Sequence, residues 1–308
     1  MSLTLVIGSR GSKLALWQAE QVRNTIELLE PESKVRIEII KTTGDVKNEP
    51  LTLIGGKGVF TKELEEALLD GRIDLAVHSL KDLPTILPSE LTIAAICKRE
   101  DPRDALVLGV EADNGYASLM KLPNRSVVGT SSQRRAAQLK ALRPDIEIKD
   151  LRGNVDTRLR KLDEAQYQAV ILASAGLRRL GLAHRISASI PVSEMLPAVG
   201  QGAIAIETRK GDEATGLAVG NLNDPETNVC CIAERALLRE LGGGCQLPIA
   251  AHATLEHQLL TLDGLVAAPD GSQIVRDQVS GAIDTAESLG AQLAAKLISQ
   301  GADKLLGR

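Results

Sequence analysis

Residues 3–29 decide the fold and read LTLVIGSRGSKLALWQAEQVRNTIELL. Leu3–Ile7 is a short apolar run, which is typical of a buried strand. Ser12 is a residue type that begins helices, and apolar residues then recur at helical spacing up to Leu29, just before Pro31. A buried strand followed by an amphipathic helix is the repeating unit of α/β folds. We therefore expect this unit to start a sheet whose functional loops gather at the carboxyl ends of its strands.

The same alternation continues through the first two-thirds of the chain. A first block contains expected strands at 35–40, 73–77 and 91–96 and a helix at 62–69. A second block contains expected strands at 126–128, 146–149 and 169–172 and helices at 134–142 and 157–162, with one more strand at 203–207. Strands that alternate with helices predict parallel α/β sheets. No internal sequence repeat is evident.

The pattern changes after residue 226. One long helix to about Leu241, three short strands between Ile249 and Val279, and a closing helix at 286–298 predict a small α+β domain. Two breaks come before it, a charged stretch with a proline at 98–103 and a second segment at 191–202.

Composition describes an ordinary globular protein with very few aromatic residues. The 308 residues are 44% hydrophobic and 25% charged, which excludes a disordered chain or a membrane bundle and allows two or three domains. The formal net charge is −4. One Trp, two Tyr and one Phe leave little to stack on bases, which argues against nucleic-acid binding.

Cysteine and histidine usage predicts neither disulfides nor a metal site. The four cysteines have no CxxC spacing, the four histidines show no ligand spacing with them, and the start does not resemble a signal peptide. These residues are Cys97, Cys230, Cys231, Cys245, His78, His184, His252 and His257. Free thiols in a reducing cytoplasm are the expectation.

Positive charge is concentrated between Arg125 and Arg185. This stretch holds thirteen lysines and arginines against six aspartates and glutamates, inside a chain that is negative overall. A guanidinium group binds a carboxylate or phosphate through two parallel hydrogen bonds. Six arginines lie at or just after expected strand ends: Arg134, Arg135, Arg152, Arg158, Arg178 and Arg179. The pattern predicts a cradle for a polyanion, with a solvated helix face or a nucleic-acid surface as alternatives.

Two turns after expected strands carry candidate site residues. Thr130–Ser132 begins a helix, where backbone N–H groups and the helix dipole favour an anion, although a plain helix cap is the alternative. His78–Asp82 ends another strand, where a carboxylate beside a lysine can act as a general base or stabilise a cation. The alternative there is a solvated turn, and His78 alone is typical of a hydrogen-bonded structural imidazole.

The stretch Gly242–Cys245 is the sharpest local feature. Three consecutive glycines predict a mobile loop with little cover, so the thiol of Cys245 is expected to be accessible and nucleophilic once ionised. A helix C-cap followed by an incidental cysteine is the alternative. Cys230 and Cys231 on a helix, and Cys97 at a strand, are expected to be buried instead.

Together these segments resemble the porphobilinogen deaminase family, also called hydroxymethylbilane synthases. The similar stretches run in order over nearly the whole chain: 8–12, 14–18, 42–45, 55–63, 74–84, 98–105, 127–132, 134–135, 152–154, 157–158, 175–177, 199–202, 233–235 and 243–248. Two positions depart from the family pattern, because Leu53 stands where a lysine is frequent and Gln133 where leucine is common. Leu53 gives the glycine-rich loop one lysine fewer than that pattern, and Lys57 remains.

The resemblance implies a three-domain transferase of porphyrin and heme biosynthesis. Two doubly wound lobes similar to periplasmic binding proteins would comprise residues 1–99 with 200–217, and residues 104–195, followed by an α+β domain at 222–308. The implied reaction condenses four porphobilinogens head to tail on a dipyrromethane primer, releasing ammonia and giving the linear tetrapyrrole hydroxymethylbilane. A monomer in the cytoplasm, without nucleic-acid or membrane partners, is implied. A non-catalytic two-lobed anion-binding protein is the alternative.

The resemblance also assigns roles to residues. Asp82 and Lys81 match catalytic positions, and a thioether to Cys245 holds the dipyrromethane cofactor. The other implied cofactor-binding residues are Ser79, Lys81, Asp82, Thr130, Ser131, Ser132, Arg134, Arg135, Ala173, Gly243 and Gly244. The implied substrate-binding residues are Arg10, Ser12, Gln18, Lys57, Phe60, Arg152, Arg158 and Arg179.

Overall fold

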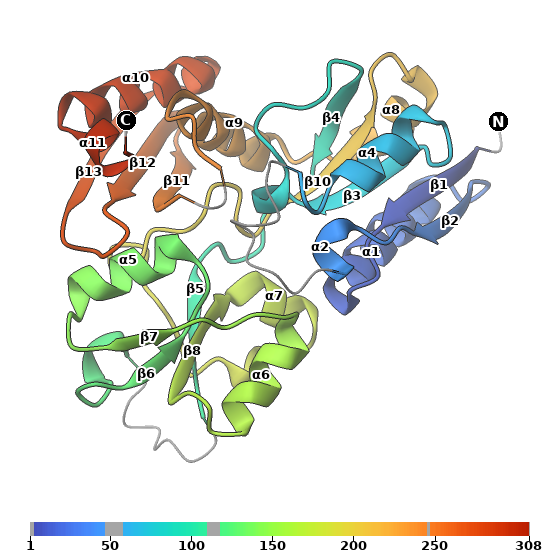
Figure 1. Cartoon of the computed structure of the whole chain (residues 1–308). Coiled ribbons are helices and arrows are strands. Elements are labelled where there is room, and N and C mark those ends of the chain that lie inside the picture. The colour runs from blue at the N-terminus through green and yellow to red at the C-terminus, as the bar shows by residue number, and fades with distance from the viewer. Residues whose placement is uncertain (1–2, 47–57, 110–117, 245–246, 308) are drawn as a thin grey trace. The chain divides into compact units, whose positions relative to one another are not determined.

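Figure 1 shows a computed structural model of the chain, which describes residues 3–46, 58–109, 118–244 and 247–307. The chain divides into two compact units. Unit 1 comprises residues 1–100 and 203–229, and unit 2 comprises residues 101–202 and 230–308. Among the described residues, no helix is long and apolar enough to cross a membrane.

Unit 1 is built on a five-stranded sheet with the strand order β2-β1-β3-β10-β4. Its strands are β1 (Thr4–Ser9), β2 (Lys34–Ile39), β3 (Leu75–Ser79), β4 (Leu91–Ile96) and β10 (Ile204–Arg209). Its helices are α1 (Lys13–Leu29), α2 (Thr43–Val46), α4 (Lys62–Leu69), α8 (Glu213–Gly220) and the 3-10 turn η1 (Leu80–Asp82). Strand β1 is parallel to β2 and β3, whereas β10 is antiparallel to both β3 and β4.

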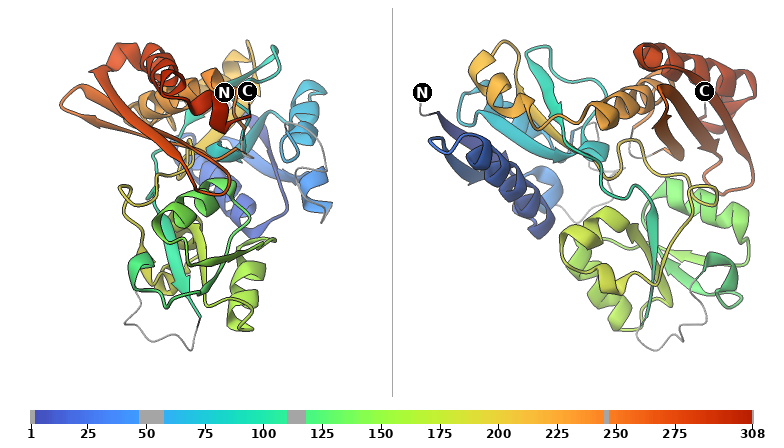
Figure 2. Two further views of the ribbon diagram at one scale, coloured as in Figure 1. Left: turned by 60° about the vertical axis from the view of Figure 1, so that its left-hand side comes forward. Right: turned by 180° about the vertical axis from the view of Figure 1, so that it is seen from behind.

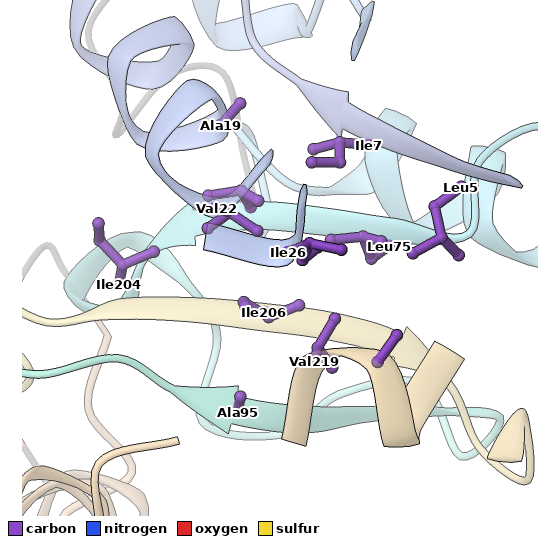
Figure 3. Close-up of a cluster of buried hydrophobic side chains, with 12 residues drawn as sticks. Leu5, Ile7, Ala19, Val22, Ile26, Leu75, Ala95, Ile204, Ile206 and Val219 are labelled. Carbon is purple, nitrogen blue, oxygen red and sulfur yellow. The ribbon is translucent and has the colours of Figure 1, made fainter. Parts of the chain in front are cut away.

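Apolar side chains cover both faces of this sheet. Figure 3 shows one face, where Val22 and Ile26 of α1 and Val219 of α8 pack over Leu75 and Ile206 of the strands. The other face packs beneath α4, whose buried residues include Leu64 and Leu68. Because successive strand residues point to opposite faces, strands covered on both sides are apolar at nearly every position.

Unit 2 begins with a second five-stranded sheet, in the order β7-β6-β8-β5-β9. Its strands are β5 (Asp104–Leu108), β6 (Val127–Gly129), β7 (Glu147–Lys149), β8 (Ala169–Ala173) and β9 (Ala188–Ser189). Its helices are α5 (Gln133–Leu142), α6 (Val155–Asp163) and α7 (Ser174–Arg179), with 3-10 turns η3 (Leu119–Lys121) and η4 (Ala183–Arg185).

The two sheets share one topology. In each, the second strand in the order pairs in parallel with the strand on either side, and the fourth position is taken by an antiparallel strand, β10 in unit 1 and β5 in unit 2. The expectation of parallel sheets is therefore right for these three paired strands and wrong for the antiparallel fourth strand. Strands β10 and β5 each follow directly from the other unit, so no crossover helix turns them parallel to their neighbours. The two sheets therefore repeat the same strand order, although no internal repeat is evident in the sequence.

The remainder of unit 2 is α+β, as expected. The long helix α9 (Pro225–Glu240) starts in unit 1, and it leads to the antiparallel strands β11 (Ile249–Glu256), β12 (Leu259–Ala267) and β13 (Ile274–Ala282). The chain ends with η5 (Ile283–Thr285), α10 (Ala286–Ser299) and α11 (Ala302–Leu305). Figure 2 shows α9 and α10 on one side of the three-stranded sheet. Apolar residues join this part to α5 in one core.

The sequence located most elements correctly and missed several short ones, among them α2, β9 and α11. The expected helix at 62–69 and the strand at 91–96 have the observed bounds. Strand β5 and helices α7 and α8 were not expected. Leu29 is 48% exposed, because the buried face of α1 runs through Ala15, Gln18, Ala19, Val22 and Ile26 instead.

We predict that Gly290 in α10 is required for close packing against α9. A Cβ at this position would lie 2.6 Å from the carbonyl oxygen of Ala233, so Gly290→Ala should lower the free energy of unfolding by about 1–3 kcal/mol through overpacking. Gly216→Ala in α8 is the matched control, because a Cβ there meets nothing within 4 Å and helix propensity favours alanine by about 1 kcal/mol. Urea unfolding of the two variants should move in opposite directions. Equal stabilisation of both would contradict the packing argument.

Candidate functional site

A pocket in unit 1 lies where β1 and β3 end. Parallel strands bring their carboxyl ends to the same edge of a sheet, which is the usual place for ligand sites in α/β folds. Six residues assigned from the resemblance line it: Arg10, Ser12, Gln18, Phe60, Ser79 and Asp82. The other lining residues are Leu14, Ala15, Thr61, Val77 and His78. Residues that are distant in the sequence are thus brought together as the resemblance implied.

The aromatic ring of Phe60 supports Arg10. The guanidinium carbon of Arg10 lies 4.2 Å from the ring centroid, a distance typical of a cation–π contact. The ring also lies against Gly44, where a Cβ would come within 2.9 Å of the ring Cζ. The backbone N–H of Gly44 donates to the carbonyl of Val59 at 3.0 Å. Only glycine fits beside the ring, so this contact fixes the orientation of Phe60 beneath Arg10.

Local hydrogen bonds fix the polar residues of the pocket. The Ser12 hydroxyl accepts from the backbone N–H of Ala15, as a helix N-cap does. The side-chain amide of Gln18 donates to the Ser79 hydroxyl at 2.9 Å. This bond ties the first helix to the end of β3, because Gln18 lies on the buried face of α1.

Asp82 lies at the edge of the pocket and is half-buried. It ends the 3-10 turn η1, which is anchored where the backbone N–H of Leu80 donates to the carbonyl of Ala203 at 3.0 Å. Within the described part of the chain, no residue donates a hydrogen bond to its carboxylate. Lys81 is also half-buried but does not line the pocket. The carboxylate of Asp82 is therefore available to a cationic ligand group.

A buried acid beside the pocket was not identified from the sequence. Glu207 of β10 is fully buried, and its carboxylate lies 2.9 Å from Nε2 of His78. His78 is thus hydrogen-bonded, as a structural imidazole would be. The sequence feature that could have revealed Glu207 is an acid within an alternating apolar strand. Burying an acid without a partner costs free energy, so such a residue indicates a buried partner.

In unit 2, Arg134 and Arg135 both bind the carboxylate of Asp104. Arg134 donates to Oδ2 at 2.8 Å, and Arg135 donates to Oδ1 from Nε at 3.0 Å and from Nη2 at 2.7 Å. All three side chains are buried. Burial opposes the charge of Asp104, but the two guanidinium groups outweigh it and hold the pKa of this carboxyl well below its usual range.

This cluster connects several elements of unit 2. Arg134 also donates to the carbonyl of Leu196 at 2.7 Å, and Arg135 to that of Ile171 at 3.0 Å. The side-chain amide of Gln201 donates to Asp104 at 2.9 Å. Ala173, at the end of β8, is paired with Asp104 in the sheet. The start of β5, the end of β8 and the start of α5 therefore meet around one carboxylate.

The hydroxyl residues before α5 have local partners. Ser132 is the N-cap of this helix, so the helix-cap interpretation is confirmed. The Ser131 hydroxyl donates to the carbonyl of Leu151 at 2.6 Å, and the hydroxyl of Thr130 accepts from the N–H of Ser132 at 3.2 Å. Thr130 is buried, whereas Ser131 is exposed. Anion binding at this helix start remains a prediction.

The remaining predicted arginines lie at helix ends and loops. Arg152 donates to Asp150 at 2.8 Å, and Nε of Arg158 donates to the carbonyl of Gly153 at 2.8 Å. Arg179, at the end of α7, donates to the carbonyl of Gly202 at 2.6 Å. Arg178, another arginine of the positive stretch, is exposed and forms an ion pair with Asp101.

The glycines after α9 are better packed than expected. Gly242 has a φ of 56° and its N–H bonds back to Arg239, as at a helix C-cap. Gly243 is buried, and a Cβ there would lie 2.6 Å from Cδ1 of Leu238. The expectation of little cover is therefore wrong for Gly243, although Gly242 and Gly244 are exposed. Cys245, Lys57 and Leu53 lie outside the described residues.

The other cysteines follow the expectation in part. Cys230 and Cys231 are buried in α9, as predicted. Cys97 is half-buried, so the expectation of burial is wrong there. Strand β4 ends at Ile96, one residue earlier.

Comparison with known proteins assigns the family. The sequence model described as "Porphobilinogen deaminase, dipyromethane cofactor binding domain" matches residues 5–216, and that of the "Porphobilinogen deaminase, C-terminal domain" matches residues 228–299. The chain belongs to the porphobilinogen deaminase family. A porphobilinogen deaminase of Chromobacterium violaceum is 52% identical over 98% of this chain and 96% of its own length. That of Thiobacillus denitrificans is 51% identical over 98% of each chain.

The donor chemistry of unit 2 fits the cofactor of the porphobilinogen deaminase family. Two buried guanidinium groups face a single carboxylate, so the cluster carries one positive charge without a counter-charge in it. Among the described residues, Nε and Nη2 of Arg134 have no hydrogen-bond partner. A buried, incompletely satisfied guanidinium favours a further carboxylate, and dipyrromethane carries acetate and propionate groups.

We predict that Asp104 is essential for the stability of unit 2. Asp104→Asn leaves two guanidinium groups buried without an anion and should cost about 3–5 kcal/mol at pH 7. Because the pKa of Asp104 is depressed in the folded chain, this contribution is present above the unfolded pKa of about 4. It is lost as the pH falls further, so the difference between native and variant proteins should shrink below that point.

Urea unfolding as a function of pH measures this effect. The control is Asp163→Asn, which removes a partly exposed ion pair with Arg185 and should change stability by at most about 1 kcal/mol. An Asp104→Asn variant as stable as this control would show that the cluster does not support the fold.

Proposed function

We infer that this chain catalyses the reaction of its family, the condensation of four porphobilinogens into hydroxymethylbilane with release of ammonia. The observation that carries this inference is the match of both family domains, together with relatives near 50% identity over nearly their full length. The pocket containing Asp82 and Arg10 adds a carboxylate and a cation of the required types. The alternative of a non-catalytic anion-binding protein has no support.

Asp82 is the residue we assign to the chemical step, with Lys81 beside it. When ammonia leaves porphobilinogen, positive charge develops on the pyrrole nitrogen of the substrate. An ionised carboxylate at the pocket edge stabilises that charge, and the absence of a donor from the described residues leaves its oxygens available. The same carboxylate can exchange a proton with the reacting group.

Basic and polar residues are proposed to bind the acetate and propionate groups of the substrate. Arg10 is held for this by Phe60, and Ser12 and Gln18 lie in the same pocket. Arg152, Arg158 and Arg179 of unit 2 take the same role, supported by their positions at the ends of α6 and α7 and the loop before them. Lys57 is assigned from the resemblance alone.

A covalently held dipyrromethane belongs to this proposal. When bound, it supplies the pyrrole end on which the chain is extended. Cys245 would hold it by a thioether, and Gly243 and Gly244 would allow close approach of its rings. The other residues proposed to bind it are Arg134, Arg135, Thr130, Ser131, Ser132, Ala173, Ser79, Lys81 and Asp82.

The proposal includes the setting of the enzyme. Residues 1–99 with 200–217, residues 104–195 and residues 222–308 are proposed as three domains, supported by one sheet in each. We also propose a monomer in the cytoplasm. Cys97, Cys230 and Cys231 are thiols rather than disulfides, which supports a reducing compartment.

We predict that Asp82→Asn slows condensation by about 10²–10⁴-fold while the chain stays folded. An amide has the shape of the carboxylate but stabilises the developing cation poorly. Ammonia release and tetrapyrrole formation measure the rate, and unfolding measures the fold. Asp70→Asn, which changes an exposed acid at the end of α4, is the control and should be fully active. Normal turnover by Asp82→Asn would remove Asp82 from the mechanism.

We predict one covalent adduct on Cys245. The thiolate attacks the methylene carbon left when porphobilinogen loses ammonia and forms a thioether, which thiol reductants do not cleave. Intact-protein mass spectrometry should show one adduct of two linked pyrrole units, mapped by digestion to the Cys245 peptide. Cys245→Ser should lack the adduct and be inactive.

The other cysteines are internal controls for this experiment. Cys230 and Cys231 are buried in α9 and Cys97 is half-buried, so all three should keep their unmodified mass. An active preparation without the adduct, or with the adduct on one of these three residues, would contradict the assignment.

A further inference from the structure

Three titratable groups lie together beside the pocket of unit 1. Nε2 of His78 lies 2.9 Å from Oε2 of Glu207, with 4% and 0% of the two side chains exposed. In the sheet, His78 is paired with Ala205, and Glu207 with Ala76. His78 and Glu207 therefore project from neighbouring strands to the same face. That face carries α4, which contributes Glu65.

Two carboxylate oxygens of this cluster are buried without a donor. Oε1 of Glu207 and Oε1 of Glu65 have no hydrogen-bond partner among the described residues. Such an oxygen is costly to bury unless the carboxyl group itself carries a proton. Burial raises the pKa of Glu65, and the negative charge of Glu207 raises it further, which favours the protonated form of Glu65. The cluster therefore holds an exchangeable proton.

His78 connects this cluster to the pocket. It lines the pocket with Thr61, Arg10 and Asp82, and its Nε2 is already used by Glu207. No residue in the described part of the chain bonds its other ring nitrogen, Nδ1. The charged and titratable groups around His78 are Glu207 from β10, Glu65 from α4, Arg10 after β1 and Asp82 from η1.

We propose that His78, Glu207 and Glu65 form a proton relay that serves the pocket. This proposal rests on the proposed function. Each condensation replaces the bond between the methylene carbon and the ammonium nitrogen of the substrate by a carbon–carbon bond, and the already protonated nitrogen leaves as ammonia with the bonding electron pair. The carbon–hydrogen bond that is replaced gives up one proton, which must leave the pocket and finally converts ammonia to ammonium in solution.

The geometry gives each member of the relay a task. His78 takes the proton from the pocket at Nδ1 and passes the proton on Nε2 to Oε2 of Glu207, 2.9 Å away. Glu65 is half-buried on α4 and returns the proton to solvent. His78 carries protons and is assigned no contact with the reacting atoms, so Asp82 remains the catalytic carboxylate.

A purely structural pair and a relay differ in measurable ways. His78→Gln keeps a side-chain donor toward Glu207 but cannot exchange protons near neutral pH. A relay predicts that kcat falls about 10- to 100-fold, less than for a direct general base, while KM is unchanged. It also predicts that the dependence of kcat on pH changes in this variant, because a proton carrier has been removed. An unchanged kcat and pH profile would overturn the relay.

Glu207→Gln provides the second test if His78→Gln does not fold. The amide still accepts the hydrogen bond from Nε2 but cannot take its proton, so kcat should fall as it does in His78→Gln. Glu66→Gln is the matched control on α4, because Glu66 is exposed and pairs with Lys62. It should leave kcat and its pH profile unchanged. A native kcat in Glu207→Gln would also overturn the relay.

Histidine side-chain NMR gives a readout that does not require activity. His78 is the one histidine in the sequence of unit 1, so its ring signals can be assigned with His78→Gln. Its ring signals should shift in Glu207→Gln, which changes the partner of Nε2, and stay in place in Glu66→Gln. If native protein makes no tetrapyrrole, the proposed function fails, and the NMR comparison still tests the coupling. A His78 signal insensitive to Glu207→Gln would contradict the relay.

Discussion

One buried carboxylate, Asp104, determines how unit 2 is assembled. It is the first residue of the antiparallel strand β5, it is fully buried, and two guanidinium groups and a side-chain amide donate to it. Removing an ionised group from water is costly unless charge and hydrogen bonds replace the solvent. Because those replacements come from α5 and from the segment before β10, the cluster fixes these elements relative to the sheet. Among the described residues, the same cluster leaves Nε and Nη2 of Arg134 without an acceptor.

Much of the fold was predictable because local patterns determine it. The helix at 62–69 and the strand at 91–96 follow from apolar spacing, and Ser12 begins α1 as its residue type suggests. Strand β5 was missed although its last four residues are apolar, because it follows the charged stretch at 98–103. The antiparallel direction of β5 and β10 could not be read from local sequence, since it depends on connections between the two units.

The candidate site was likewise predictable only in part. Residues that follow strands, such as Asp82 and Thr130, were identified because strand ends are where α/β folds place ligands. Their partners were not identified, because the pairing is distant in sequence. His78 and Glu207 are 129 residues apart, and Arg135 and Asp104 are 31 apart. Sequence alone shows which residues bear charge, and only the fold shows which charges are neutralised.

The two sheets share more than a strand order, because each antiparallel fourth strand carries one buried acid. Glu207 lies in β10 and Asp104 in β5, and both strands are central and covered on two faces, so neither acid can reach solvent for compensation. The partners then determine the chemistry. Asp104 meets two permanent cations, which leaves positive charge suited to carboxylates. Glu207 meets an imidazole and a second acid, which are groups that can carry a proton. One topology thereby buries an acid at the same position of each sheet, and the neighbouring side chains give the two acids different surroundings.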